Sequence, residues 1–245
     1  MYRNYRFGFK KNLIFLTFFE KFTFCEEIVD KSAKKCYTKR INNLISSKCK
    51  LRKTKMTTIY FIRHAQPNYN NPDDASRELT AKGLQDRKLV TSFLFDKHID
   101  AVLSSPYKRA VDTVADFAEI SNLRIETVWD FRERKVDSVW IDDFNSFCKK
   151  QWEDFNYKLS DGETLGEVQN RNITALNKVL ADYNGKNIAI GSHGTALSTI
   201  INYYDKTFGY SDFDKIRNIM PWIVKFVFNG NICVEIEKYN LFEIG

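Results

Sequence analysis

The hydrophobic and polar positions of this chain alternate between strand-like and helix-like patterns from residue 56 onward. Residues 57–62 are all β-branched, aromatic or aliphatic, which predicts a buried strand, and Pro67 and the polar residues 68–74 end it. Further short apolar runs predict strands, and longer stretches with apolar residues three or four positions apart predict helices between them. The predicted strands are 57–62, 99–104, 123–128, 187–191, 222–228 and 232–239, and the predicted helices are 79–94, 106–118, 142–155, 163–183 and 195–204. Thr80 is the predicted N-cap of the first helix, which keeps Leu84 on its apolar face.

This order of elements predicts an α/β fold. Strands that alternate with helices are joined by right-handed crossovers, so we expect a three-layer α/β/α sandwich with a mostly parallel central sheet. Asn229-Gly230-Asn231 joins the last two strands, which predicts an antiparallel C-terminal hairpin. The regularity breaks between residues 129 and 162, a long connection with one helix, and we expect this segment to form a small helical cap insertion over the site.

The first 55 residues differ from the rest in charge. They hold 15 of the 38 Lys and Arg residues and 4 of the 31 Asp and Glu residues, so the net charge of +7 divides into +11 for this segment and −4 for residues 56–245. The main domain, 56–245, therefore gives no indication of binding nucleic acid. Met56 stands directly before the first strand, as an initiator would, and we interpret residues 1–55 as a basic extension outside the fold. A basic arm for nucleic acid or anionic lipid, and a transit peptide, are the alternatives.

Neither a membrane span nor a secretory leader is predicted. The most apolar run, 13–19, falls short of the roughly 20 residues that a membrane span needs, and Glu20 and Lys21 follow it. No small-residue cleavage site comes after it, which disfavours a signal peptide. The five cysteines show no framework spacing and no CxxC motif, which suits a reducing compartment. We expect a cytoplasmic protein without a membrane partner.

Residues able to bind an anion follow three of the predicted parallel strands. Arg63 and His64 follow the first strand, Arg109 lies in the first turn of the helix after the second, and His193 follows the fourth. Because ligands bind at the carboxyl ends of strands in open α/β sheets, we expect these side chains to converge. The backbone N–H groups of Gly194 and the next residue begin a helix and are expected to point toward an anion held there.

These residues belong to short motifs whose order and spacing resemble those of the histidine phosphatase superfamily, with its phosphoglycerate mutase-like fold. The motifs, which extend from Met56 to about Tyr239, are Arg63-His64-Ala65-Gln66, Leu79-Thr80-x-x-Gly83, Ser105-x-x-x-Arg109-Ala110-x-x-Thr113, Arg132-Glu133, Gly162-Glu163 and Ser192-His193-Gly194. Each motif is short, and the resemblance rests on all of them together. It implies no cofactor and no metal.

The resemblance implies a role for each site residue. His64 is implied as the nucleophile that takes up the phosphoryl group, and Glu133 as the proton donor to the leaving oxygen. The implied phosphate ligands are Arg63, Arg109 and His193, with Asn70 assisting and with Gly194 at the start of the helix. Because Glu133 stands among three basic residues, a solvated salt-bridge cluster is the alternative for it. Glu163 is interpreted as structural, at the start of a helix.

Physical chemistry supports these roles separately from the resemblance. Phosphoryl transfer needs positioning and neutralisation of the equatorial oxygens, and two guanidinium groups provide both without a metal. The nucleophile His64 must attack as a neutral imidazole, with one nitrogen free and the other held as a donor by a backbone carbonyl. An alkoxide is a poor leaving group, and an acid that protonates it contributes roughly 10²- to 10⁴-fold.

Departures from the mutase pattern favour a phosphatase. Ala65 and Pro67 stand where mutases usually have Gly and Ser, and Val136 and Asp137 stand in place of the expected Tyr and Gly. We therefore expect a metal-independent phosphomonoester hydrolase that acts through a phosphohistidine on a small phosphorylated metabolite or a phosphoprotein. A cofactor-dependent phosphoglycerate mutase is the second hypothesis, and a phosphate-binding regulator without turnover is the third. No motif indicates an oligomeric state.

Overall fold

The computed structural model of the protein describes residues 55–138 and 141–243. The extension expected over residues 1–55 lies outside the described residues, except for Lys55, and its interpretation stays a prediction. Among the described residues, no helix combines the length and the apolar character that crossing a membrane requires.

Six strands form a single mixed sheet, as the alternating pattern predicts. The strands are β1 (Met56–Arg63), β2 (Ala101–Ser104), β3 (Ile125–Thr127), β4 (Asn187–Ser192), β5 (Trp222–Asn229) and β6 (Ile232–Tyr239). Their order is β3-β2-β4-β1-β5-β6. The first four in this order are parallel, whereas β5 is antiparallel to both β1 and β6. The expected antiparallel hairpin at the C-terminal edge is confirmed.

The helices are α2 (Ala81–Leu94), α3 (Lys108–Ile120), the 3₁₀ turn η1 (Trp129–Phe131), α4 (Phe144–Glu153), α5 (Leu165–Asp182), α6 (Gly194–Tyr204) and α7 (Tyr210–Ile216). The sequence pattern did not predict α7. The helix expected from residue 163 begins at Leu165, because Thr164 and Glu167 form a capping box that fixes the first turn there. Thr80, the predicted N-cap of α2, accepts a hydrogen bond from the amide of Gly83 at 3.0 Å.

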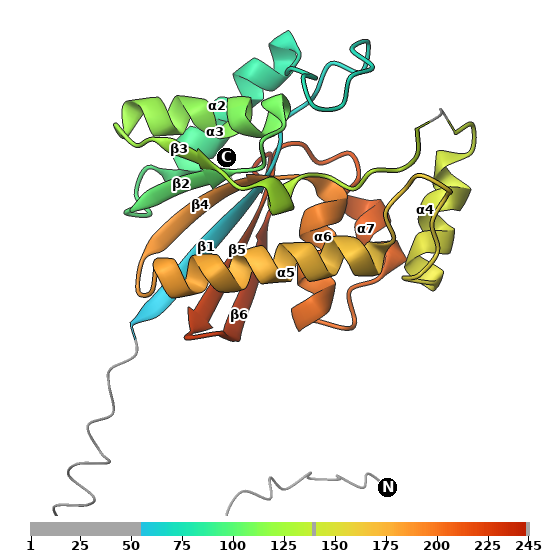
Figure 1. The fold of residues 1–245 in the computed structure, drawn as a ribbon. Coiled ribbons are helices and arrows are strands. Elements are labelled where there is room, and N and C mark those ends of the chain that lie inside the picture. Colours follow the sequence, from blue (N-terminus) through green and yellow to red (C-terminus); the bar gives the residue numbers. More distant parts are fainter. Residues whose placement is uncertain (1–54, 139–140, 244–245) are drawn as a thin grey trace, which may run out of the picture. The chain divides into compact units, whose positions relative to one another are not determined.

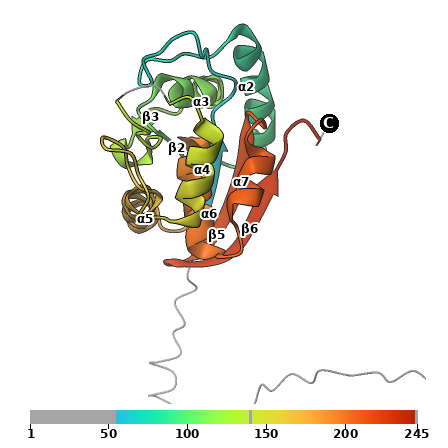
Figure 2. The ribbon, with the colours of Figure 1, turned by 90° about the vertical axis from the view of Figure 1, so that its right-hand side faces the viewer.

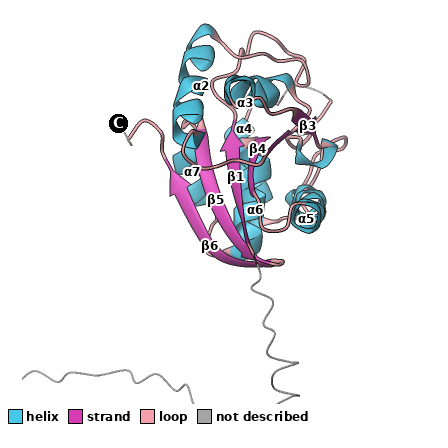
Figure 3. Ribbon diagram, turned by 90° about the vertical axis from the view of Figure 1, so that its left-hand side faces the viewer, coloured by secondary structure: helices cyan, strands magenta, loops and turns pink. Residues whose placement is uncertain are grey.

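The sheet lies between two layers of helices (Figure 1). Successive side chains of a strand point to opposite faces, so Ile59 and Phe61 pack with α5 and α6 while Tyr60 and Ile62 pack with α2 and α3. Figure 3 shows the strands, in magenta, in the layer between α2 and α5. This arrangement confirms the predicted three-layer sandwich. The prediction that Leu84 faces the core from α2 is wrong, because 42% of the surface of this residue is exposed.

The segment between residues 129 and 162 carries the expected helix, α4. This helix buries Phe147, Cys148 and Trp152, and it lies beside α7 (Figure 2). The rings of Trp152 and Phe213 of α7 have their centroids 5.6 Å apart. The inserted helix is therefore anchored to α7, the helix that directly precedes β5.

Candidate active site

Two histidines stand side by side because their strands are paired in register. β1 and β4 are parallel neighbours in which Arg63 pairs with Ser192. The next residues, His64 and His193, therefore leave the sheet at the same edge. The amide of His64 donates a hydrogen bond to the carbonyl oxygen of Ser192 at 3.0 Å, and the centroids of the two imidazole rings lie 5.3 Å apart.

His64 is held in one tautomer. Its Nδ1 lies 2.8 Å from the carbonyl oxygen of Ala65, and because a carbonyl oxygen can only accept, Nδ1 carries the hydrogen and Nε2 keeps its lone pair. Burial lowers the pKa of His64 well below its ordinary value, and the positive charges of Arg109 and Arg63 lower it further. The imidazole is therefore neutral near pH 7 and has a free nitrogen.

His193 is fully buried beside it. Its Nε2 lies 2.7 Å from the hydroxyl oxygen of Ser105, whereas its Nδ1 is buried without a hydrogen-bond partner in the described part of the chain. Burial, followed by the charge of Arg109, lowers the pKa of His193 well below its ordinary value. The ring of Tyr107 lies against it, with the centroids 5.3 Å apart.

Arg63 is held by main-chain oxygens near the end of α7. Its Nη1 donates to the carbonyl of Ile216 at 2.5 Å, and its Nη2 donates to that of Arg217 at 2.9 Å. Its Nε is buried without a partner in the described residues. Burial lowers the pKa of Arg63 to about 10, so the guanidinium stays charged at neutral pH. A Cβ on Gly194 would come within 3.1 Å of the Nε and Cζ atoms of Arg63, so any other residue here would press on the guanidinium.

Arg109 lies in the first turn of α3 and is 3% exposed. Its Nη1 donates to the carbonyl of Asp74 at 2.5 Å, and its Nη2 is 3.1 Å from the Oδ1 of the same residue. The guanidinium carbon is 5.1 Å from the ring centre of Tyr107. Burial lowers the pKa of Arg109, and the carboxylate of Asp74 opposes this shift.

The carboxylate of Glu133 sits on the N-terminus of α6. Its Oε2 accepts a hydrogen bond from the amide of Thr195 at 3.0 Å, and its Oε1 accepts from those of Ala196 at 3.1 Å and Arg134 at 2.8 Å. The sequence led us to expect the amides of Gly194 and Thr195 to face a bound anion. That expectation is wrong for Thr195, because a carboxylate of the protein itself takes its N–H group.

The basic neighbours of Glu133 have other partners. Arg132 pairs with Glu163 at 3.0 Å, and Arg134 donates to the hydroxyl of Thr195 at 2.8 Å. Within the described ranges, no ion pair involves Glu133, so it is not part of the salt-bridge cluster considered as the alternative. Glu163 lies before the helix, where it also accepts from Arg171 at 2.9 Å.

The structure does not bring Asn70 together with these residues. Asn70 is exposed, and its backbone amide donates a hydrogen bond to Oδ1 of Asn68 at 3.1 Å. Its role in phosphate binding stays a prediction. Conversely, sequence reasoning assigned no role to Ser105 or Asp74, although each contacts a predicted site residue. Ser105 belongs to the motif that also contains Arg109, and this motif could have identified it as a site residue. Asp74 lies in a polar loop that contains no such motif.

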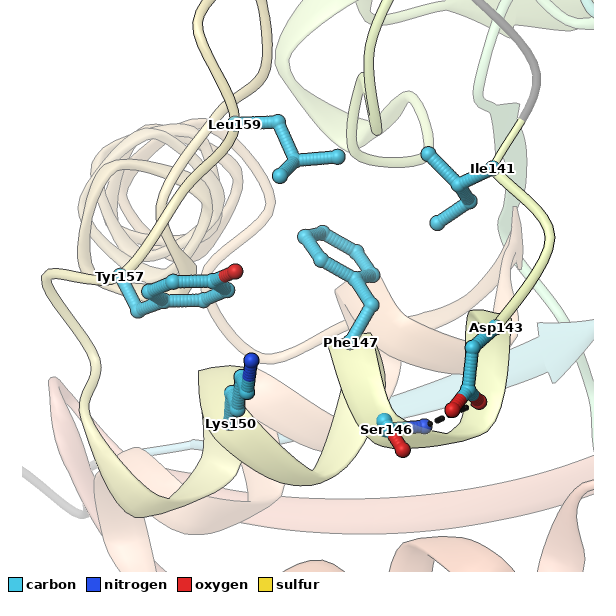
Figure 4. A pocket seen from close by; sticks show the side chains of 7 residues that line it. All are labelled: Ile141, Asp143, Ser146, Phe147, Lys150, Tyr157 and Leu159. Carbon is cyan, nitrogen blue, oxygen red and sulfur yellow. Dashed lines mark hydrogen bonds between the residues drawn. The ribbon is translucent and has the colours of Figure 1, made fainter.

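A separate open cavity of about 380 Å³ lies beside α4 (Figure 4). The residues that line it are Ile141, Asp143, Ser146, Phe147, Lys150, Tyr157 and Leu159. None of the predicted site residues is among them. The ring centre of Phe147 lies 5.4 Å from the guanidinium carbon of Arg134, the residue after Glu133.

Known proteins resemble this chain in both sequence and fold. The uncharacterized phosphatase PhoE of Bacillus subtilis is 25% identical over 150 residues, which is 60% of this chain and 76% of that protein. Phosphoserine phosphatase 1 of Hydrogenobacter thermophilus is 27% identical over 157 residues, 56% of this chain and 71% of that protein. A solved mycobacterial glucosyl-3-phosphoglycerate phosphatase shares the fold, with a TM-score of 0.62 at 15% identity over 76% of this chain and 99% of that one.

The model of one protein family covers most of the chain. It is described as the histidine phosphatase superfamily (branch 1) and matches residues 59–230. This range includes all three strand ends that carry the paired histidines and the two buried arginines. The chain therefore belongs to the histidine phosphatase superfamily.

Proposed function

We propose that this phosphatase relative hydrolyses phosphomonoesters through a phosphohistidine on His64. The observation that carries the proposal is the state of that imidazole: Nδ1 donates to a carbonyl, Nε2 is free, and the pKa lies well below its ordinary value. A neutral imidazole with one free nitrogen is the form that can attack phosphorus. The guanidiniums of Arg63 and Arg109 lie close enough to influence its charge state.

In the first step, Nε2 of His64 attacks phosphorus and the bond from phosphorus to the ester oxygen breaks. The leaving oxygen takes a proton from Glu133, and the alcohol departs. On this carboxyl group, Oε1 already accepts two amide hydrogen bonds and Oε2 accepts one. Because each oxygen has two lone pairs, Oε2 is the atom with room for the proton.

In the second step, water attacks the phosphohistidine. Glu133, now a carboxylate, accepts a proton from the water, the phosphorus–nitrogen bond breaks, and inorganic phosphate leaves with His64 restored. Arg63 and Arg109 supply positive charge for the phosphate oxygens in both steps, and together with His193 they supply hydrogen-bond donors. The buried Nε of Arg63 and Nδ1 of His193, which lack partners in the described part of the protein, are available for this purpose.

The names of two relatives support a proposal for the substrate class. One is a phosphoserine phosphatase, and a structural neighbour is a glucosyl-3-phosphoglycerate phosphatase. Both names describe phosphate esters of small aliphatic alcohols. We extend this class to the present chain and expect a small phosphorylated metabolite rather than a phosphoprotein.

The test is hydrolysis of p-nitrophenyl phosphate and of phosphoserine by the purified protein. We expect release of inorganic phosphate from both, no loss of turnover in the presence of a chelator, and loss of turnover in His64→Ala. Isomerisation of 3-phosphoglycerate with only trace hydrolysis would favour a mutase instead. Binding of inorganic phosphate without either activity would favour a regulator.

A further inference from the structure

Asp74 contacts the buried guanidinium of Arg109 through both its main chain and its side chain. The carbonyl oxygen accepts from Nη1 at 2.5 Å, and Oδ1 lies 3.1 Å from Nη2. Arg109 has five N–H groups in a rigid fork, so these two contacts fix its plane and leave three donors for a ligand.

The same carboxylate joins a second arginine to the first. Oδ1 of Asp74 accepts from Nη1 of Arg77 at 2.8 Å. The positive charge of Arg77 contributes to lowering the pKa of both Arg109 and His64, so Arg77 acts electrostatically on the site. The shared carboxylate therefore reduces the repulsion between two guanidinium groups that would otherwise push each other away.

Hydrogen bonds fix the loop that carries Asp74 on both sides of this residue. Asn68 and Asn71 donate side-chain hydrogen bonds to the carboxylate of Glu78, at 2.5 and 2.9 Å. The carbonyl of Ala75, the residue after Asp74, accepts from the amide of Lys108 at 2.9 Å, directly before Arg109. The loop thus holds Asp74 in a defined place over the first turn of α3.

We propose that Asp74 is a positioning residue, which orients and neutralises Arg109 for binding the phosphoryl group. This inference rests on the proposed function of the site. A bidentate contact with phosphate needs the guanidinium plane within a fraction of an ångström of its place, and a long arginine side chain loses rotamer entropy when it is fixed there. Because Asp74 already fixes Arg109 in the free protein, this entropy is lost before the substrate binds. Asp74 remains 43% exposed itself, so its own charge stays solvated.

The carboxylate of Asp74 can also weaken phosphate binding by repulsion, and the experiment distinguishes this effect from positioning. A carboxylate 3.1 Å from Nη2 of Arg109 is also near any anion bound by that arginine and repels it. If repulsion outweighed positioning, removing the charge of Asp74 would tighten phosphate binding.

The experiment is a double-mutant cycle on the full chain. Asp74→Asn, which keeps the size and the main-chain contact, is made with Arg109 present and in the Arg109→Ala background. The dissociation constant of inorganic phosphate is measured by calorimetry, and kcat and KM for p-nitrophenyl phosphate are measured beside it. Asp73→Asn is the matched control, because the Asp73 side chain accepts from Ala75 within its own loop, and an asparagine can keep that bond.

We expect Asp74→Asn to weaken phosphate binding about tenfold when Arg109 is present and to change nothing in Arg109→Ala. Asp74→Glu is expected to restore part of the loss, and Asp73→Asn to resemble the parent protein. Tighter phosphate binding, an equal loss in both backgrounds, or no phosphate binding by the parent protein would each overturn the inference. A parent protein that binds phosphate but hydrolyses no ester would refute the proposed function alone, since the phosphate affinities still test Asp74.

Discussion

The amide of Thr195 donates a hydrogen bond to Oε2 of Glu133 at 3.0 Å, so the first turn of α6 binds a carboxylate from the protein's own chain. A helix N-terminus carries about half a positive charge and favours any anion placed there. Here that place is taken by a residue 62 positions earlier in the sequence. The amides thereby hold Glu133 at the first turn of α6, the helix whose N-cap is His193.

This arrangement makes the role of Glu133 testable with Glu133→Gln. If Glu133 protonates the leaving oxygen, hydrolysis of phosphoserine, whose leaving group is a basic alkoxide, should slow by roughly 10²- to 10⁴-fold. Hydrolysis of p-nitrophenyl phosphate should slow much less, because nitrophenolate leaves without a proton. The measurement is kcat for the two substrates, compared as a ratio.

Asp137→Asn serves as the control, since Asp137 belongs to the same loop and accepts from the amide of Ser138 instead. Equal losses for both substrates in Glu133→Gln would mean that Glu133 organises the site without donating a proton. If Glu133→Gln had no effect while Asp137→Asn impaired phosphoserine hydrolysis, the acid would be Asp137.

A second prediction concerns the covalent intermediate. Brief reaction with a phosphorus-labelled ester, followed by quenching, should give a protein-bound label that is labile in acid and stable in base, as expected for a phosphorus–nitrogen bond. The chain contains three histidines, and variants of two of them test the location of the label. It should disappear in His64→Ala and persist in His98→Ala, because His98 is exposed and precedes β2, whereas His64 and His193 follow the carboxyl ends of their strands. A stoichiometric label in His64→Ala would exclude His64 as the nucleophile.

A third prediction uses the close approach of Gly194 to Arg63. A methyl group on Gly194 would sit 3.1 Å from the Nε and Cζ atoms of Arg63, which is tighter than most Cβ contacts in proteins, so the guanidinium would have to shift by a few tenths of an ångström. Since three main-chain carbonyls hold the end of this guanidinium, it cannot retreat without breaking hydrogen bonds. Gly194→Ala should therefore lower kcat/KM, but by less than the roughly 10²-fold expected for a misplacement of about 1 Å, because a shift of a few tenths of an ångström relieves the contact.

Gly209→Ala is the matched control for this prediction, because a Cβ at Gly209 meets no atom within 4 Å. It should leave kcat/KM close to that of the parent protein. The thermal unfolding midpoint of both variants is recorded to separate loss of fold from loss of function. Unimpaired turnover in Gly194→Ala would show that the position of Arg63 is not critical.

Much of this site was predictable because parallel strands bring their carboxyl ends to one edge of the sheet. Arg63, His64, Arg109 and His193 each follow an apolar run, and a local pattern of that kind is visible in the sequence. The fold class followed from the same alternation. Thr80 was predictable as an N-cap because its hydrogen bond is local, to the amide three residues later.

The remaining parts of the site depend on main-chain atoms and on distant contacts. The carbonyls that hold Arg63 lie 153 to 156 residues away from it, and every residue has a carbonyl, so no side-chain pattern marks them. The helix that positions them, α7, is only seven residues long, too short for its apolar spacing to be recognised as helical in the sequence. Leu84 follows the helical period but lies on the exposed side of α2, because tertiary packing decides which part of a broad apolar stripe is covered.

The last prediction is a loss of stability in mild acid that comes from the two buried histidines. Burial and the charge of Arg109 lower the pKa values of His64 and His193 well below the ordinary 6.5. In the unfolded chain both histidines take up protons near pH 6.5, whereas in the folded protein they remain neutral to much lower pH. The unfolded state then binds more protons, so the free energy of unfolding is greatest above pH 6.5 and falls as the pH drops below it, by up to about 1.4 kcal/mol per pH unit for each histidine.

Urea unfolding at pH 7.5 and pH 5.5 measures this loss in a range where most carboxylates keep their charge. His193→Asn should lose less stability than the parent protein between the two pH values, because it lacks one of the two protons taken up on unfolding. His98→Asn should lose as much as the parent protein, since His98 is exposed. The comparison is made without phosphate, because a bound anion favours protonated histidines and opposes the effect. Equal losses in all three proteins would mean that His193 is not held neutral by its burial.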